Sequence, residues 1–147
     1  MHRKSILIFT LLLLSSCASL PPEKFVLQDI PVDVIGSRPY IWAALNGKRY
    51  QFMLDTGATD FLLTESMVKE LGLKYSNNNT MKASGITGII NLKTIDKISL
   101  RLDNGIVLNV SDVAVVKKDG FGLFPYKFFE LLNVTWDVKN SKLIFKK

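Results

Sequence analysis

The tripeptide Asp55-Thr56-Gly57, which directly follows the apolar stretch Phe52-Met53-Leu54, is the part of the sequence most suited to chemistry. The single histidine and the single cysteine of the 147-residue chain, His2 and Cys17, both lie within its first seventeen positions. If this leader is removed or embedded in a membrane, the remaining domain has neither an imidazole nor a thiol. Ser-His-Asp and Cys-His catalysis, cysteine-rich zinc sites and disulfide frameworks are then excluded. Carboxylate, hydroxyl, lysine and backbone chemistry remain.

The segment Asp55-Thr56-Gly57-Ala58-Thr59 resembles the active-site signature of aspartic proteases, Asp-Thr/Ser-Gly-Ala/Ser. On its own, the tripeptide is also compatible with a turn after a strand, with its glycine at positive φ. Three further segments match in order: Arg38-Pro39 upstream, the glycine-rich stretch Ser84 to Ile90, and Leu123 to Phe129 near the C-terminus. Across roughly residues 35–145, the chain therefore resembles the retropepsin-like, single-lobe aspartic proteases.

This resemblance implies a mostly β fold, a closed acid-protease barrel with one or two short helices, that is active as a homodimer. Aspartic proteases use two carboxylates that share one proton, because like charges about 3 Å apart cannot both ionise. The ionised carboxylate acts as general base on a water, and the protonated one polarises the scissile carbonyl. The signature occurs once in this chain, so Asp55 from each of two subunits would form the dyad about a twofold axis.

The resemblance also implies roles for residues around Asp55. Thr56 would hydrogen-bond across the dimer, and Gly57 would allow the backbone and the substrate to approach closely. The other two residues expected to brace the active-site loop are Ala58 and Thr59. The glycine-rich stretch would form a flap that pairs with an extended peptide or protein substrate through its backbone. The expected flap residues are Gly85, Ile86 and Gly88.

Three positions depart from the retroviral pattern. Thr59 and Tyr126 stand where retroviral enzymes usually carry an acid and an arginine, which join the upstream arginine in an ion-pair cluster at the dimer. Only Arg38 of that cluster remains, so we expect that it does not form in the usual way. Pro125 replaces the turn glycine of the C-terminal motif, and proline fixes φ and removes a backbone donor. None of these changes removes the catalytic atoms.

The N-terminal residues have the pattern of a signal peptide. Arg3 and Lys4 precede an apolar run from Ile6 to Leu14 that is too short to span a bilayer comfortably. The tetrapeptide Leu14-Ser15-Ser16-Cys17 resembles a bacterial lipobox, in which the cysteine is lipidated and becomes the new N-terminus. The alternative is ordinary secretory cleavage after Ala18, with the cysteine incidental.

The leader also sets the expected domain organisation and location. We expect a signal peptide over residues 1–17, a tether leading into the fold over 18–34, and the protease domain over 35–147. A lipidated chain would lie in the bacterial cell envelope, at the outer membrane or the periplasmic face. Without lipidation the chain would be secreted.

The charge pattern argues against nucleic acid as a partner. Lys and Arg number 19 against 13 Asp and Glu, a formal net charge of +6, but the lysines are scattered and no arginine-rich or aromatic-interleaved stretch occurs. Acids do not recur at the alternate positions of a calcium loop, and we expect neither a metal nor a cofactor.

Alternating polar and apolar residues, punctuated by turn signals, predict a mostly β domain. Asn46-Gly47 predicts a type I′ turn between strands at 40–45 and 48–54. The other expected elements are a hairpin of strands 95–102 and 106–116, a helix from Thr64 or Glu65 to Leu71, a short helix over 128–132, and two strands within 134–145. The aromatic residues expected in core or interface packing are Trp42, Phe52, Phe61, Phe124, Phe128, Phe129 and Trp136.

Two functions fit the sequence. The first is a membrane-tethered, extracytoplasmic aspartic endopeptidase that acts through an Asp55 dyad, with Asp60 as a further acid able to line a substrate subsite. The second is a non-catalytic peptide-binding or structural lipoprotein that retains the fold as a monomer. The oligomeric state separates them, because a strictly monomeric chain cannot assemble the dyad.

Overall fold

The structure, a computed structural model, describes residues 27–77, 80–85 and 88–146. Most of these residues lie in strands, and the two helices are short. In chain order, the elements are β1 (Ile30–Pro31), β2 (Asp33–Ile35), β3 (Arg38–Leu45), β4 (Lys48–Asp55), β5 (Leu62–Thr64), α1 (Glu65–Glu70), β6 (Thr80–Gly85), β7 (Gly88–Leu102), β8 (Val107–Val116), β9 (Gly122–Pro125), α2 (Lys127–Leu131), β10 (Val134–Asp137) and β11 (Lys142–Phe145). The expected mostly β fold class is confirmed.

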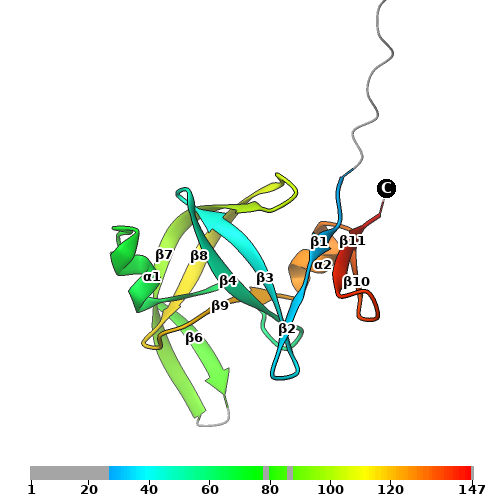
Figure 1. The fold of residues 1–147 in the computed structure, drawn as a ribbon. Coiled ribbons are helices and arrows are strands. Elements are labelled where there is room, and N and C mark those ends of the chain that lie inside the picture. The colour runs from blue at the N-terminus through cyan, green and yellow to red at the C-terminus, as the bar shows by residue number, and fades with distance from the viewer. Residues whose placement is uncertain (1–26, 78–79, 86–87, 147) are drawn as a thin grey trace, which may run out of the picture.

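A closed barrel forms the body of the molecule (Figure 1). The larger sheet has the order β2-β3-β4-β9-β5-β8-β7-β6, and β7 pairs in addition with β3. That pairing closes β3, β4, β9, β5, β8 and β7 on one another, which removes the free edges of an open sheet. The outer strands β2 and β6 are attached to the barrel without being part of its wall.

The turn chemistry of the sequence accounts for the first hairpin. Asn46 and Gly47 both have positive φ, 47° and 81°, as a type I′ turn requires, and β3 pairs with β4 across them. The short helix α1 begins after Thr64, whose hydroxyl accepts a hydrogen bond from the backbone N–H of Met67 at 3.2 Å. Both elements lie where the sequence predicts them.

Strand β7 differs from the prediction because it is one strand of 15 residues. The sequence predicts a flap over Ser84 to Ile90, alternation that continues through Ile98, and a hairpin strand over 95–102. The first part of β7 instead pairs with β6, from Gly85↔Gly88 to Thr80↔Lys93, and the rest pairs with β8. The β6–β7 hairpin therefore projects from the barrel wall as a direct continuation of a wall strand (Figure 1).

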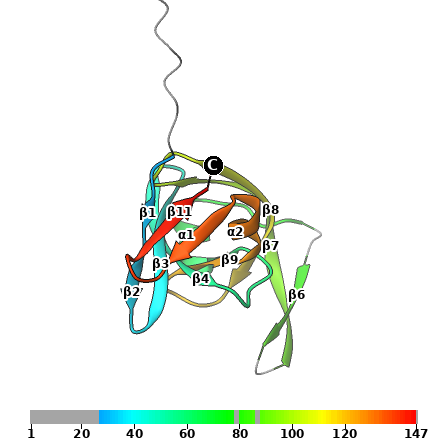
Figure 2. The ribbon, with the colours of Figure 1, turned by 90° about the vertical axis from the view of Figure 1, so that its right-hand side faces the viewer.

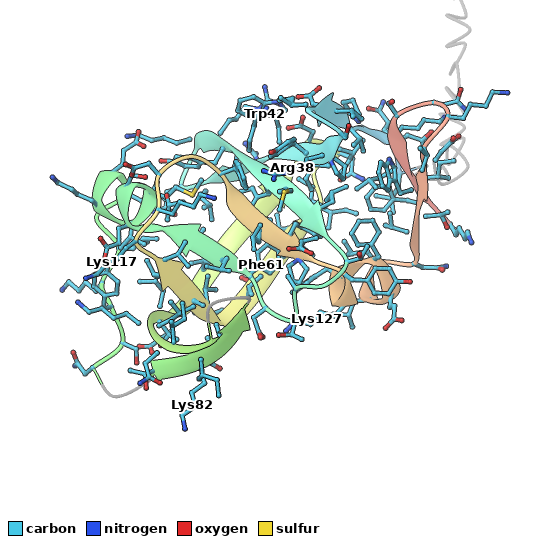
Figure 3. The ribbon with its side chains drawn as sticks, turned by 90° about the horizontal axis from the view of Figure 1, so that it is seen from below. Arg38, Trp42, Phe61, Lys82, Lys117 and Lys127 are labelled. Atoms are coloured by element: carbon cyan, nitrogen blue, oxygen red, sulfur yellow. The ribbon has the colours of Figure 1, made fainter. Side chains whose placement is uncertain are left out.

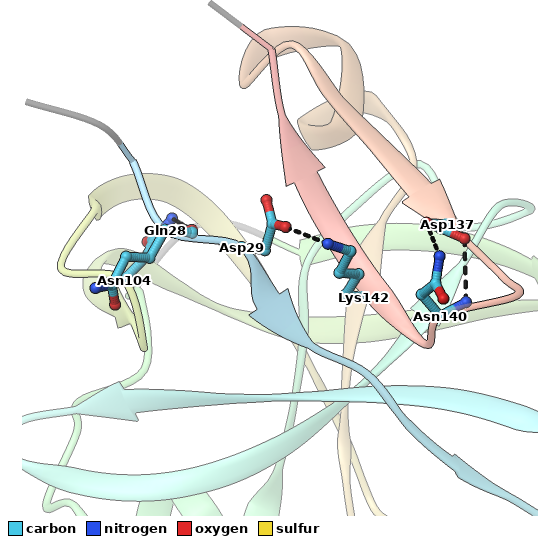
Figure 4. Close-up of polar contacts among 6 residues, drawn as sticks. All are labelled: Gln28, Asp29, Asn104, Asp137, Asn140 and Lys142. Carbon is cyan, nitrogen blue, oxygen red and sulfur yellow. Dashed lines mark hydrogen bonds and ion pairs between the residues drawn. The ribbon is translucent and has the colours of Figure 1, made fainter.

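A second, three-stranded sheet of order β1-β11-β10 packs with α2 beside the barrel (Figure 2). It joins the two ends of the described chain, because β1 pairs with β11 through Ile30↔Leu143. Lys142 Nζ lies 2.6 Å from Asp29 Oδ2 beside this pairing, and Asn104 Nδ2, in the turn between β7 and β8, donates to the carbonyl of Gln28 at 3.1 Å and so joins the segment before β1 to the barrel (Figure 4). Residues 30–34 of the expected tether thus take part in both sheets.

The core lies inside the barrel and between the barrel and α2. Phe61 is at its centre, with its ring centroid 4.5 Å from that of Phe128 and 4.8 Å from that of Phe124, both in edge-to-face geometry. The buried aromatic residues among those expected in packing are Phe52, Phe61, Phe124, Phe128 and Phe129. The tryptophans differ: Trp42 is only half-buried and donates to Asp33 Oδ2, and Trp136 packs against the edge of the core.

No helix in the described residues is long and apolar enough to cross a membrane.

Candidate active site

Asp55 is the last residue of β4, and its position is set by strands from distant parts of the chain. Strand β9 lies between β4 and β5, parallel to β4 through Asp55↔Pro125 and antiparallel to β5 through Leu62↔Leu123. The active-site loop, residues 55–60, therefore leaves one wall strand and returns to another with β9 held between them. This arrangement fixes both ends of the loop to the barrel.

Hydrogen bonds hold the Asp55 side chain at the start of the loop. Its Oδ1 accepts from the backbone N–H of Gly57 at 2.9 Å, and its own carbonyl accepts from the N–H of Ala58 at 3.3 Å. The side chain is half-buried, so one oxygen is held by the loop while the carboxylate stays accessible from the cleft.

Gly57 is not required by its backbone conformation, and a Cβ at this position would make only an ordinary contact with the Asp55 carboxylate. Its φ lies outside the left-handed region, so a turn with this glycine at positive φ is not what the structure contains. A Cβ at this position would lie 3.4 Å from Asp55 Oδ1. The glycine thus leaves one face of the carboxylate open.

A cleft of about 520 Å³ opens in front of Asp55. The active-site loop forms one side, the barrel wall the back, and strand β6 the other side. The residues lining it are Asp55, Gly57, Ala58, Thr59, Asp60, Leu62, Met81, Lys82, Ala83, Leu92, Ala114 and Leu123. The structure therefore brings Asp55 and Gly57 of the signature to the same cleft as β6 of the β6–β7 hairpin, through Met81, Lys82 and Ala83 and not through the predicted flap residues Gly85 and Gly88.

Asp60, the second acid of the cleft, is held by two partners. Its Oδ2 accepts from the Thr59 hydroxyl at 2.5 Å, and its Oδ1 lies 3.1 Å from Nζ of Lys127, which projects from α2 (Figure 3). Partial burial acts to raise the pKa of Asp60, but the bonds from Thr59 and Lys127 outweigh it and lower that pKa. Asp60 is therefore ionised at neutral pH and ties the active-site loop to α2.

The ion pair between Asp60 and Lys127 was not predicted from the sequence. The positions at which the family carries its acid and its arginine are occupied here by Thr59 and Tyr126, which cannot form an ion pair. The observed pair lies one residue further along in both segments. Its two residues are 67 positions apart, so only the docking of α2 against the loop reveals it.

The other departures have local explanations. Pro125 is fully buried at the end of β9, where a missing N–H ends the ladder beside Asp55. The ring of Tyr126 stacks on that of Phe129, with centroids 5.7 Å apart and planes at 17°. Arg38 is exposed at the start of β3.

The remaining predicted site residues are placed in part. Thr56 is exposed in the turn after Asp55. Gly85 and Gly88 face each other at the last pair of the β6–β7 hairpin. Ile86, predicted in the flap, and Cys17, predicted as the lipidation site, lie outside the described residues.

Within the described ranges, no group of three or more His, Cys, Asp or Glu side chains is arranged to hold a metal ion. The chemistry available in the cleft is that of its two carboxylates, its hydroxyl and Lys82.

Comparisons with known proteins agree with this geometry. A retropepsin-like aspartic protease from Rickettsia conorii has a similar solved structure, with a TM-score of 0.56 and 20% sequence identity over 80% of this chain and 90% of that one. A search of curated proteins found no match. The model of the gag-polyprotein putative aspartyl protease family matches residues 41–128, from β3 into α2 and including Asp55. This match spans more than half of the chain, and the chain therefore belongs to that family of retropepsin-like aspartic proteases.

Proposed function

We propose that this protein is an aspartic endopeptidase whose catalytic dyad consists of Asp55 from each of two identical subunits. The observation that carries the proposal is the position of Asp55. Its carboxylate opens onto the 520 Å³ cleft, with one oxygen held by the Gly57 N–H and the face beside that glycine left unfilled.

The second carboxylate of the dyad has to come from another copy of the chain. Asp60 is the other acid that lines the cleft, but both of its oxygens are occupied by Thr59 and Lys127. Its lowered pKa is the opposite of what a proton-sharing carboxylate requires. Asp55 has no such cationic partner among the described residues, so it is the acid suited to pair with its symmetry mate.

In the dimer, the two Asp55 side chains would divide the work of hydrolysis. The ionised carboxylate takes a proton from a bound water, whose oxygen attacks the scissile carbonyl carbon. The protonated carboxylate donates its proton toward the carbonyl oxygen. When the C–N bond breaks, one carboxyl group transfers its proton to the leaving amine, and the other carboxylate takes a proton from a hydroxyl of the tetrahedral intermediate, so that the dyad again holds one shared proton.

Strand β6 supplies the opposite side of the peptide site. Met81, Lys82 and Ala83 line the cleft across from the active-site loop. A peptide bound between them would be extended, with alternate side chains pointing toward the loop and toward the hairpin. The substrate class that fits is thus an extended segment of a peptide or protein.

We further propose that the enzyme works in the bacterial cell envelope, tethered by a lipid on Cys17. The lipobox-like sequence supports this assignment. Strand β1, where the described chain begins, lies at the opposite end of the molecule from the β6–β7 hairpin (Figure 1). A tether attached there would leave the cleft accessible to substrates. Radiolabelled fatty acid should be incorporated into the wild-type chain and not into Cys17→Ser; equal labelling of both would contradict lipidation at this residue.

The catalytic assignment is tested by Asp55→Asn, with Asp96→Asn as the matched control. Asp96 is an exposed acid on β7 and lies outside the cleft lining. We expect Asp55→Asn to reduce cleavage of a peptide library by about 10³-fold or more at acidic to neutral pH, with circular dichroism unchanged. Asp96→Asn should keep wild-type activity. Full activity in Asp55→Asn would refute the proposal.

A further inference from the structure

A second groove, of about 590 Å³, adjoins the catalytic cleft along the first part of β7. Its lining residues are Glu65, Ile90, Asn91, Leu92, Lys93, Val115, Val116, Lys117 and Lys118. Leu92 lines both hollows, so the hairpin is a shared wall between them. The family assignment and the proposed chemistry make no use of this groove.

The groove runs along an unpaired strand edge. Strand β7 pairs with β6 from Gly88 onward, but its pairing with β8 begins only at Lys93↔Val115. Residues 88–92 therefore have a neighbouring strand on one side and, within the described part of the chain, none on the other. Backbone N–H and C=O groups of alternate residues point to opposite sides of a strand, so part of this stretch presents its groups toward the groove.

The charge of the groove is positive. Lys93, Lys117 and Lys118 face a single acid, Glu65, and none of the three lysines forms a salt bridge within the described residues. Two of them rest on aromatic rings: Lys93 Nζ lies 4.8 Å from the centroid of Tyr75, and Lys118 Nζ lies 5.5 Å from that of Phe121. These contacts position the ammonium groups without neutralising them.

The walls between the lysines are apolar. Ile90 is 50% exposed on the hairpin, and Val115 and Val116 come from the end of β8. An unpaired strand edge, apolar walls and cationic side chains together match an extended peptide that carries both acidic and apolar residues. A lipid headgroup or a free phosphate would use the lysines but not the strand edge.

We propose that this groove is a second peptide-binding site, which takes an acidic, extended peptide segment by adding it as a strand to the free edge of β7. The segment would pair with residues 88–92, place apolar side chains against Ile90 and Val116, and place carboxylates near Lys117 (labelled in Figure 3) and Lys118. Because the groove shares Leu92 with the catalytic cleft, its occupation would also shift the wall of that cleft. If the enzyme is a protease, the groove would serve as an exosite that holds part of a protein substrate outside the catalytic cleft. This role rests on the proposed function, whereas the binding of the peptide does not.

The test measures binding and does not depend on catalysis. The probe is a short fluorescein-labelled peptide of alternating glutamate and valine, and the protein is the full chain in nonionic detergent with Asp55→Asn, which prevents cleavage. We expect the acidic probe to bind and a lysine–valine probe not to bind, as fluorescence anisotropy would show.

Two charge-reversal variants separate the groove from overall charge. Lys117→Glu with Lys118→Glu should weaken binding by about tenfold or more at low salt, whereas Lys139→Glu with Lys146→Glu, exposed lysines outside the groove, should change it less than about twofold. Equal effects of the two pairs would overturn the proposal.

Hydrogen exchange then tests the strand pairing itself. The bound probe should slow amide exchange within residues 88–92. Binding that depends on Lys117 and Lys118 without this protection would show a purely electrostatic contact and would contradict strand addition. Binding to phosphatidylglycerol vesicles with the same lysine dependence, and no binding of the probe, would instead identify a membrane-facing surface.

Discussion

The two sides of the catalytic cleft are held in different ways. The active-site loop, residues 55–60, is fixed by partners far away in sequence: Pro125 lies beside Asp55 in the parallel register, and Lys127 reaches Asp60 from α2. The β6–β7 hairpin is held mainly by its own two strands, in the register from Gly85↔Gly88 to Thr80↔Lys93. One side of the cleft is part of a closed barrel, and the other projects from it.

This difference matches what the proposed chemistry needs from each side. A dyad works only if both carboxylates stay within hydrogen-bond reach, which requires a loop braced by the whole barrel. A hairpin that closes over different extended peptides has to move, and it therefore needs fewer contacts with the barrel. We therefore expect changes at the loop and its supports to affect folding or turnover strongly, and changes at the hairpin to affect substrate binding more mildly.

The largest effect on stability is expected at Gly122, which supports the loop from behind. A Cβ there would lie 2.6 Å from ring atoms of Phe52 and 2.7 Å from the carbonyl oxygen of Leu62. Gly122→Ala must therefore push β4 and β5 apart, the two strands that flank the loop. We expect a loss of about 2–4 kcal/mol in the free energy of unfolding, measured by urea denaturation.

Ser111→Ala, at an exposed position on β8, is the control for this variant and should be near neutral. If Gly122→Ala were as stable as that control, the close packing of β9 between β4 and β5 would be wrong.

A smaller effect is expected from the pair that joins the loop to α2. Asp60→Asn and Lys127→Met should each lower activity by about tenfold through loss of loop position. They should lower stability by only about 0.5 kcal/mol, because the pair is partly exposed. The partly exposed pair of Asp29 and Lys142 in the terminal sheet is the matched control, and breaking it should leave turnover unchanged.

The stability contribution of Asp60 has a defined pH dependence. Its pKa is lowered in the folded state, so the contribution is fully present above the unfolded value of about 3.9 and is lost as the pH falls through the folded value. The stability difference between wild type and Asp60→Asn should therefore shrink below about pH 4. A difference that grows on acidification would contradict the assignment.

The mildest effect is expected on the hairpin side. Met81 is half-buried, lines the cleft from β6 and lies opposite Leu92 in the β6–β7 register. Met81→Ala should raise KM a few-fold and leave kcat and the melting temperature nearly unchanged, because the side chain lines the cleft from β6 and not from the active-site loop. A loss of kcat as large as that of Asp60→Asn would remove the distinction between the two sides.

The sequence predicts the local features of both sides well. Asn46-Gly47 specifies its turn because both residues need positive φ, and Thr64 starts α1 because its hydroxyl caps the first turn. The Asp55 signature was also expected to face the flap hairpin, and Asp55 shares one cleft with Met81, Lys82 and Ala83 of β6, which precede the glycine-rich stretch. In each case the residues that determine the structure are close together in the chain or form a known motif.

Features that depend on distant segments were not predicted. The pairing of β3 with β7 closes the barrel, and β9 lies between β4 and β5. The alternation of polar and apolar residues shows which face of a strand is buried, but not which strand lies next to it. The contact of Lys127 with Asp60 likewise exists only once α2 packs on Phe61. The alternation predicts a strand that leads out of the flap, but not that β7 changes partner along its length, from β6 to β8.

The central claim, that the active site is shared between two subunits, is tested most directly by mixing. Wild type and Asp55→Asn are unfolded together, refolded so that subunits associate at random, and assayed at constant total protein. If each active site needs Asp55 from both subunits, an equal mixture should have about a quarter of wild-type activity, because only dimers of two wild-type chains are active. About half of wild-type activity would show that each chain works alone and would contradict the account.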